Sequence, residues 1–180
     1  TAADTPRIEA TGEPRVRVGL IGAGARMRDC HAPVLDALRD RFEVVGVTSR
    51  SAQGREALAQ ARGWKAFDSM PALVEGGQPD FLLVAVGTEA NVPVLYQAMG
   101  FGLPLLAETP LSWNERDGSA LVRQARGRGI ALRGPGADDL PPDFDFHLHR
   151  GSPHPGQLGD EMNQITDVHR GEECERVDRS

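Results

Sequence analysis

The stretch that decides the fold is Val18-Gly19-Leu20-Ile21-Gly22-Ala23-Gly24-Ala25-Arg26-Met27, residues 18–27. Its continuously apolar start is typical of a strand buried on both faces of a parallel sheet. A glycine turn follows, and apolar residues then recur at helical spacing. The first glycine of such a turn permits the tight bend, and the second lets the backbone approach a phosphate at the N-terminus of the helix. The pattern predicts a pyrophosphate site at Gly22, Gly24, Ala25 and Arg26.

Two features bear on this prediction. The third small residue of the usual fingerprint is replaced by Met27, whose bulk is expected to push the helix and the strand apart. A glycine turn in an α/β protein can also bind nothing. Its position at the first turn of a series of strand and helix units favours nucleotide binding.

Strands alternate with helices along residues 15–133. Strands are predicted at 15–21, 42–48, 65–67, 81–86, 104–107 and 130–132, and helices at 27–38, 53–62, 70–75, 91–99 and 114–128. This alternation predicts an α/β fold, a Rossmann-type doubly wound parallel sheet. Residues 15–133 are therefore interpreted as a dinucleotide-binding domain.

The two ends of the chain have a different texture. Residues 1–14 are predicted to be a flexible lead-in, and the Gly- and Pro-rich residues 134–143 a linker. Residues 144–180 suffice for about two strands and one helix, a short α+β appendage. So small a sheet needs a cover, and the expected covers are the first domain, a second copy of the chain in a homo-oligomer, or a partner chain.

The end of the second strand indicates which nucleotide binds. NAD-binding proteins usually place an acid here to hold the ribose 2′-hydroxyl, but this chain has Thr48-Ser49-Arg50. Ser49 can donate to a 2′-phosphate, and Arg50 can pair with it. The alternative is a solvated arginine on a surface loop. The sequence favours NADP over NAD.

Composition excludes several classes of protein. The chain has 180 residues and a formal net charge of -6. It has no long basic tract for nucleic acid and no apolar run long enough to cross a membrane. Cys30 and Cys174 are far apart in sequence, so we expect reduced thiols in a cytoplasmic protein.

Four segments resemble the glucose-fructose oxidoreductase and inositol dehydrogenase (Gfo/Idh/MocA) family. They are the opening strand and turn at 16–24, the second strand at 42–50, the strand and helix at 80–94, and 102–111, which resembles a strand ending in the family's Glu-Lys-Pro motif. The resemblance implies a nicotinamide-dependent oxidoreductase acting on a small polar molecule, such as a sugar or a polyol. Residues 159–168 resemble the family segment that carries a catalytic Asp and His.

The chain departs from the family at two catalytic positions. Thr109 replaces the motif lysine and Gln164 replaces the histidine, while Asp160 matches the aspartate. Neither Thr nor Gln titrates near neutral pH, so neither can act as an ordinary general acid or base. Asp160, His147 and His149 are the candidate catalytic residues, the histidines as substitute acid/base groups on one strand face. A metal site among the histidines lacks any tight ligand motif and is not predicted.

Further cofactor contacts are expected where strands end at the carboxyl edge of the sheet. The candidates there are Val86, Gly87, Thr88, Asn91, Glu108 and Thr109. His31 is predicted to be buried and hydrogen-bonded. Trp113 is interpreted as a core or surface anchor, with lining of the nucleotide cleft as the alternative.

Three functions remain open. The first is an NADP-dependent oxidoreductase that acts on a small-molecule substrate. The second is a catalytically silent NADP-binding protein, a sensor or a partner subunit, which the changes at Thr109 and Gln164 favour. The third is redox-neutral chemistry, in which a retained cofactor is oxidised and reduced within one cycle.

Overall fold

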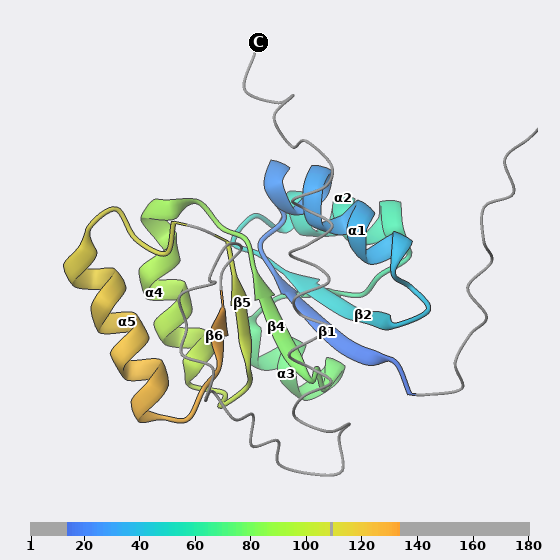
Figure 1. Cartoon of the computed structure of the whole chain (residues 1–180). Helices are drawn as coiled ribbons and strands as arrows, with labels where there is room; N and C mark the ends of the chain where they lie inside the picture. The colour runs from blue at the N-terminus through green and yellow to red at the C-terminus, as the bar shows by residue number, and fades with distance from the viewer. Residues whose placement is uncertain (1–13, 109, 134–180) are drawn as a thin grey trace, which may run out of the picture.

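A six-stranded parallel sheet forms the centre of the domain (Figure 1). The computed structural model describes residues 14–108 and 110–133. The strands are β1 (Val16–Ile21), β2 (Phe42–Thr48), β3 (Ala66–Phe67), β4 (Phe81–Val84), β5 (Leu105–Ala107) and β6 (Leu132–Arg133). Their order in the sheet is β3-β2-β1-β4-β5-β6, and all neighbours are parallel. The predicted Rossmann-type architecture is confirmed.

The helices complete the alternation. They are η1 (Met27–His31), α1 (Ala32–Ala37), α2 (Ala52–Arg62), α3 (Met70–Gly77), α4 (Thr88–Met99) and α5 (Glu115–Gly127). Each element predicted within residues 15–133 is present. The largest shift is at α4, which begins three residues before the predicted 91, because β4 already ends at Val84 and Gly87 forms the N-cap of the helix.

Two hydrophobic layers enclose the sheet. On one face, Leu20 of β1 belongs to a buried cluster with Leu35 of α1 and Leu58 of α2. On the other face, buried residues of the sheet join α3, α4 and α5 through Leu73, Leu95 and Leu121. Successive residues of β4 alternate between the two clusters, so its continuous apolar run is buried on both sides. Figure 1 shows α4 and α5 side by side at one end of the sheet.

The helix after the glycine turn contains a π-helical segment that the sequence did not predict. The backbone N–H of Ala32 donates to the carbonyl of Met27, five residues earlier, which is the π pattern. Met27 is fully buried and belongs to the cluster on the α1 and α2 face. The bulky residue therefore occupies the core between helix and sheet, in a helix whose regular winding is interrupted at that point. Such π turns occur frequently at functional sites.

The order of the strands positions the site. The chain runs outward in opposite directions from β1 and β4, so the sheet has its switch point between these two strands. In open α/β sheets, ligands bind beyond the carboxyl ends of the strands at such a point. The segments that follow β1, β2, β4 and β5 meet at this edge.

Candidate functional site

The glycine turn after β1 is packed on one side and open on the other. Gly22 has φ +113°, and a Cβ there would lie 2.1 Å from the carbonyl oxygen of Ala85. Only glycine fits this position without strain. Gly24 is exposed, and a Cβ on it would meet nothing within 4 Å. The space beside Gly24 is therefore free for a ligand to approach the backbone.

A helix begins directly after this turn. The N–H of Arg28 donates to the carbonyl of Gly24 at 3.0 Å, which places Gly24 at the start of the helix. The first N–H groups of a helix have no partner within it, and they carry the positive end of the helix dipole. Ala25 and Arg26, both exposed, lie in this first turn. The arrangement suits a phosphate group, so the residues present fit the pyrophosphate of a dinucleotide.

The segment after β2 lies beside the glycine turn. The N–H of Gly22 donates to the carbonyl of Thr48, the last residue of β2, at 2.8 Å. A Cβ on Gly54 in the first turn of α2 would lie 3.8 Å from the carbonyl oxygen of Ala23. The turn and the start of α2 are thus neighbours, as a nucleotide spanning both would require.

The β2–α2 loop, residues 48–51, carries the candidate phosphate contacts. The hydroxyl of Ser49 donates to the carbonyl of Ser51 at 2.8 Å. The hydroxyl of Ser51 accepts from the N–H of Gly54 and caps α2. Arg50 is exposed, and Ser49 is half-buried. No carboxylate stands at positions 48–51.

The segment after β4 forms the next part of the edge. The N–H of Ala85 donates to the carbonyl of Ile21 at 2.9 Å, so this segment is fixed to the end of β1. Val86 and Thr88 are half-buried, while Gly87 is exposed and a Cβ on it would meet nothing within 4 Å. These three residues, expected from the sequence to contact a cofactor, lie at the same edge as the glycine turn.

Glu108 joins the end of β5 to the helix after the glycine turn. His31 Nε2 lies 2.6 Å from Glu108 Oε2, and the His31 side chain is only 3% exposed. Arg26 Nε lies 3.8 Å from Glu108 Oε1. The prediction that His31 is buried and hydrogen-bonded is confirmed. The contacts fix the Glu108 carboxylate at the edge where the sequence placed a cofactor contact.

Asn91 of α4 holds the segment that follows β5. Its Nδ2 lies 3.2–3.4 Å from the carbonyl oxygens of Glu108, Pro110 and Leu111. Its Oδ1 is buried and has no hydrogen-bond partner among the described residues. Asn91 is 2% exposed, so its side chain braces the backbone at this edge from within the fold.

Two neighbouring charges lie on the exposed side of the π-helical segment. Arg28 forms two hydrogen bonds of 2.7 Å to the carboxylate of Asp29. The hydrogen bond from Arg28 holds the pKa of the Asp29 carboxyl below its usual value. The same hydrogen bond raises the pKa of the Arg28 guanidinium. Both groups therefore stay charged across the neutral range.

Sequence reasoning missed Arg55. It lies on α2 with only 8% of its surface exposed, and its guanidinium contacts the β2–α2 loop. The signal was present in the helical spacing, because Arg55 shares the buried face of α2 with Leu58 and Ala59. An arginine on an apolar stripe indicates a buried, partnered cation.

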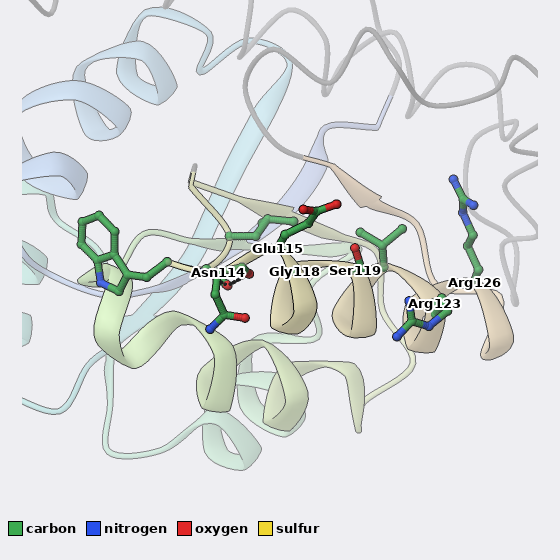
Figure 2. Close-up of a pocket in the computed structure, with 10 residues that line it drawn as sticks. Asn114, Glu115, Gly118, Ser119, Arg123 and Arg126 are labelled. Atoms are coloured by element: carbon green, nitrogen blue, oxygen red, sulfur yellow. Dashed lines mark hydrogen bonds between the residues drawn. The ribbon is translucent and has the colours of Figure 1, made fainter.

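Trp113 contributes to a separate surface pocket of about 550 Å³. It is 74% exposed, so the core position is excluded. Figure 2 shows the pocket along α5, with Asn114 near the start of the helix and Arg123 and Arg126 near its end. No candidate cofactor residue lines this pocket, so the alternative that Trp113 lines the nucleotide cleft is not supported.

Several sequence predictions lie outside the described residues. These are the roles of Thr109, His147, His149, Asp160 and Gln164, the linker and the appendage. The expectation of reduced thiols is wrong for Cys30, which is disulfide-bonded. Within residues 14–108 and 110–133, no group of three or more His, Cys, Asp or Glu side chains could hold a metal ion. In that same part of the chain, no helix is long and apolar enough to cross a membrane.

Comparison with known proteins finds a family model that matches the described domain. Residues 16–133 match the model of the Gfo/Idh/MocA proteins, described as an oxidoreductase family with an NAD-binding Rossmann fold. The chain is 31% identical over 119 residues to dTDP-3,4-didehydro-2,6-dideoxy-alpha-D-glucose 3-reductase from Streptomyces antibioticus, covering 66% of this chain and 36% of the relative. It is 32% identical over 101 residues to inositol 2-dehydrogenase from Corynebacterium glutamicum, covering 54% and 29%.

A solved structure agrees with these sequence matches. KijD10, a 3-ketoreductase from Actinomadura kijaniata in complex with NADP and TDP-benzene, superposes with a TM-score of 0.61 at 26% identity. The match covers 67% of this chain and 37% of that one. The chain thus spans about a third of the length of the relatives it matches.

Proposed function

Because the chain belongs to the Gfo/Idh/MocA oxidoreductase family, we propose that it is an NADP-dependent oxidoreductase acting on a small polar, sugar- or polyol-like substrate. NADP supplies or accepts the hydride when it is bound. The residues of this chain bind and orient it. Gly22, Gly24 and Arg26 hold the pyrophosphate, and the β2–α2 loop holds the adenosine end.

The observation that carries the choice of NADP is the charge of the β2–α2 loop. Positions 48–51 hold no acid that would accept from a ribose 2′-hydroxyl, and they include Arg50 and two serine hydroxyls. The start of α2 adds a positive dipole end beside them. An added 2′-phosphate would meet donors and a cation here, whereas it would be repelled by an acid. The family description names NAD, and the KijD10 structure contains NADP.

The substrate class rests on the relatives. One reduces a deoxysugar nucleotide by its name, and another oxidises inositol by its name. The first name describes a didehydro sugar, which carries keto groups on its ring, and the second a polyol, so the proposed substrate is a compact molecule with hydroxyl or keto groups on a ring. The substrate, which must meet the nicotinamide end of NADP, would be bound by residues beyond 133.

A second candidate is a catalytically silent NADP-binding protein, a sensor or a partner subunit. Threonine at position 109 favours it, because the family lysine that the resemblance places there is absent. Loss of a general acid or base typically slows a reaction by about a hundredfold to ten-thousandfold. Hydride transfer depends on the position of the cofactor more than on a base, so binding and a slow redox reaction can coexist.

A titration followed by a single-turnover assay tests both candidates. The purified chain is titrated with NADPH and with NADH, and the NADPH complex is then mixed with a panel of cyclic ketones, keto sugars and inosose compounds. The proposal expects tighter binding of NADPH and loss of absorbance at the nicotinamide band with at least one substrate class. Binding of NADPH without its oxidation by any compound of the panel would favour the second candidate, a catalytically silent NADP-binding protein. Absence of binding to either dinucleotide would refute both.

A further inference from the structure

A buried arginine lies directly beneath the β2–α2 loop. Arg55 of α2 is 8% exposed, and its Nη1 donates to the carbonyl of Ser49 at 3.1 Å. Its Nη2 donates to Asp68 Oδ1 at 2.5 Å. Asp68 follows β3, and its side chain is 92% exposed. One guanidinium therefore connects the loop after β2 to the loop after β3.

This connection fixes the backbone that carries the candidate phosphate contacts. The two bonds use different nitrogens of a planar, rigid group. The bond to Asp68 therefore fixes the orientation of the guanidinium that binds the Ser49 carbonyl. The Ser49 carbonyl belongs to the peptide bond that joins Ser49 to Arg50, so this contact also fixes the backbone from which the side chains of Ser49 and Arg50 extend. A loop of this kind would otherwise lose entropy when a ligand ordered it, and that cost lowers affinity.

The arginine also carries a cost for stability. Its Nε is buried and has no hydrogen-bond partner among the described residues. A buried unsatisfied donor is destabilising, and an apolar residue at this position would avoid it while still packing beside Leu58 and Ala59. The remaining function for a cation at this position is to hold and orient its partners, and one of these partners is the β2–α2 loop.

We propose that Arg55 is a positioning residue that sets the preference for NADP over NAD. It acts through Arg50: by binding the Ser49 carbonyl, it holds the β2–α2 loop in the conformation in which Arg50 receives the 2′-phosphate. This rests on the proposed function, because it presupposes that the chain binds NADP. The glycine turn makes its contacts to the pyrophosphate without Arg55, so NAD binding depends on it less.

The test compares Kd values for NADPH and NADH in four variants and the wild type. Arg55→Lys keeps the charge but replaces the fork by a single ammonium. Arg50→Ala removes the direct contact, and Arg50→Ala with Arg55→Lys completes a double-mutant cycle. Arg62→Lys is the matched control, since Arg62 lies on the same helix and is ion-paired with Asp36 instead of the loop. Thermal unfolding without ligand is measured for all of them.

The inference expects Arg55→Lys to weaken NADPH binding at least fivefold and NADH binding by less than twofold. Arg62→Lys leaves the ratio of the two Kd values within twofold of the wild type. In the Arg50→Ala background, Arg55→Lys adds less than a twofold change in that ratio, because its effect passes through the same contact. A crystal structure of the wild type with NADPH retains the bond from Arg55 to Ser49, which tests the idea even where a variant unfolds.

Three results would overturn this inference and leave the proposed function intact. Equal weakening of both nucleotides by Arg55→Lys would assign Arg55 a structural role only. A full effect of Arg55→Lys in the Arg50→Ala background would show that it does not act through the loop contact. A wild-type complex in which Arg55 has left Ser49 would do the same. A wild type that binds no dinucleotide, or prefers NADH, refutes the proposed NADP function itself and this inference with it.

Discussion

Changing Gly22 or Gly24 of the turn to alanine is expected to have opposite effects: the first change lowers stability, and the second weakens ligand binding. In Gly22→Ala the new Cβ would lie 2.1 Å from the carbonyl oxygen of Ala85, and that backbone is itself fixed by the bond from the Ala85 N–H to Ile21. Neither the backbone of residue 22 nor that of Ala85 can move without breaking hydrogen bonds between the ends of β1 and β4. The positive φ of +113° adds strain for any residue with a side chain. Strain and overpacking together cost about 2–6 kcal/mol.

Gly24→Ala is expected to fold normally. Its Cβ meets nothing within 4 Å, and its φ is not in the left-handed region. Reduced freedom of the unfolded chain makes the change neutral or stabilising by up to about 1 kcal/mol. The new methyl group occupies the space through which a pyrophosphate reaches the backbone. We expect NADPH binding to weaken at least tenfold, which corresponds to about 1.4 kcal/mol.

Thermal unfolding with and without NADPH separates the two effects. Gly22→Ala lowers the Tm of the free protein by roughly 4–24 °C, at about 2–4 °C for each kcal/mol in a chain of this size. Gly24→Ala keeps the Tm of the free protein within a few degrees but loses much of the ligand effect. With NADPH at 100 times the wild-type Kd, ligand stabilisation falls from about 2.7 kcal/mol to about 1.4 kcal/mol after a tenfold loss of affinity.

Two outcomes would refute this reasoning. A Gly24→Ala variant that binds NADPH as tightly as the wild type would show that the open space is not where the phosphate approaches. A Gly22→Ala variant as stable as the wild type would contradict the close contact between the turn and β4. Gly63→Ala is a useful comparison, because that glycine also has a positive φ, +69°, but a Cβ there meets nothing within 4 Å.

Three further changes test the surroundings of the turn. His31→Leu removes the 2.6 Å contact to the carboxylate of Glu108, which keeps its contact with Arg26, so urea unfolding should show a loss of about 1–3 kcal/mol; an unchanged midpoint would contradict the contact. Asn91→Leu leaves three carbonyls without their donor, so amide exchange in the segment after β5 should accelerate while β1 stays protected. Asp29 should titrate below the ordinary aspartate pKa of about 3.9 by NMR, and Arg28→Gln should raise that pKa toward it. Because the folded pKa of Asp29 is lowered, its contribution to stability is present above the ordinary pKa and is lost as the pH falls through the lowered pKa. Solvent screening at this exposed pair keeps that contribution small.

Most of the fold could be predicted because its signals are local. The apolar runs of β1 and β4 report burial on both faces, and Gly22 after β1 marks a turn position that only glycine fits without strain. The π-helical turn could not be predicted, because it depends on how Met27 meets the sheet in three dimensions. The start of α4 was placed too late for a similar reason, since Gly87 gives no side-chain cap to mark it.

The sequence predicted several residues of the site but not the side-chain contacts between them. The sequence placed Glu108 and His31 separately, one as a cofactor contact and one as a core histidine. Their pairing at 2.6 Å joins positions 77 residues apart, which no local pattern encodes. Arg55 was overlooked because residues 53–62 were predicted only as a helix, and the charge of Arg55 was not weighed against the apolar residues that share its face.

The edge of the sheet is held together by backbone bonds that continue beyond the strands. Gly22 N–H binds Thr48, Ala85 N–H binds Ile21, and Glu108 N–H binds Val84, so each segment at the edge is tied to the neighbouring strand. These bonds join backbone atoms, so they use no side chain that a cofactor would need. A preorganised edge lowers the ordering cost of binding. Cofactor affinity is therefore expected to reside within residues 14–133, while the proposed catalysis is expected to depend on position 109 and on the candidate residues beyond 133. It follows that substitutions at Asp160, His147 or His149 should change turnover and leave the Kd for NADPH unchanged.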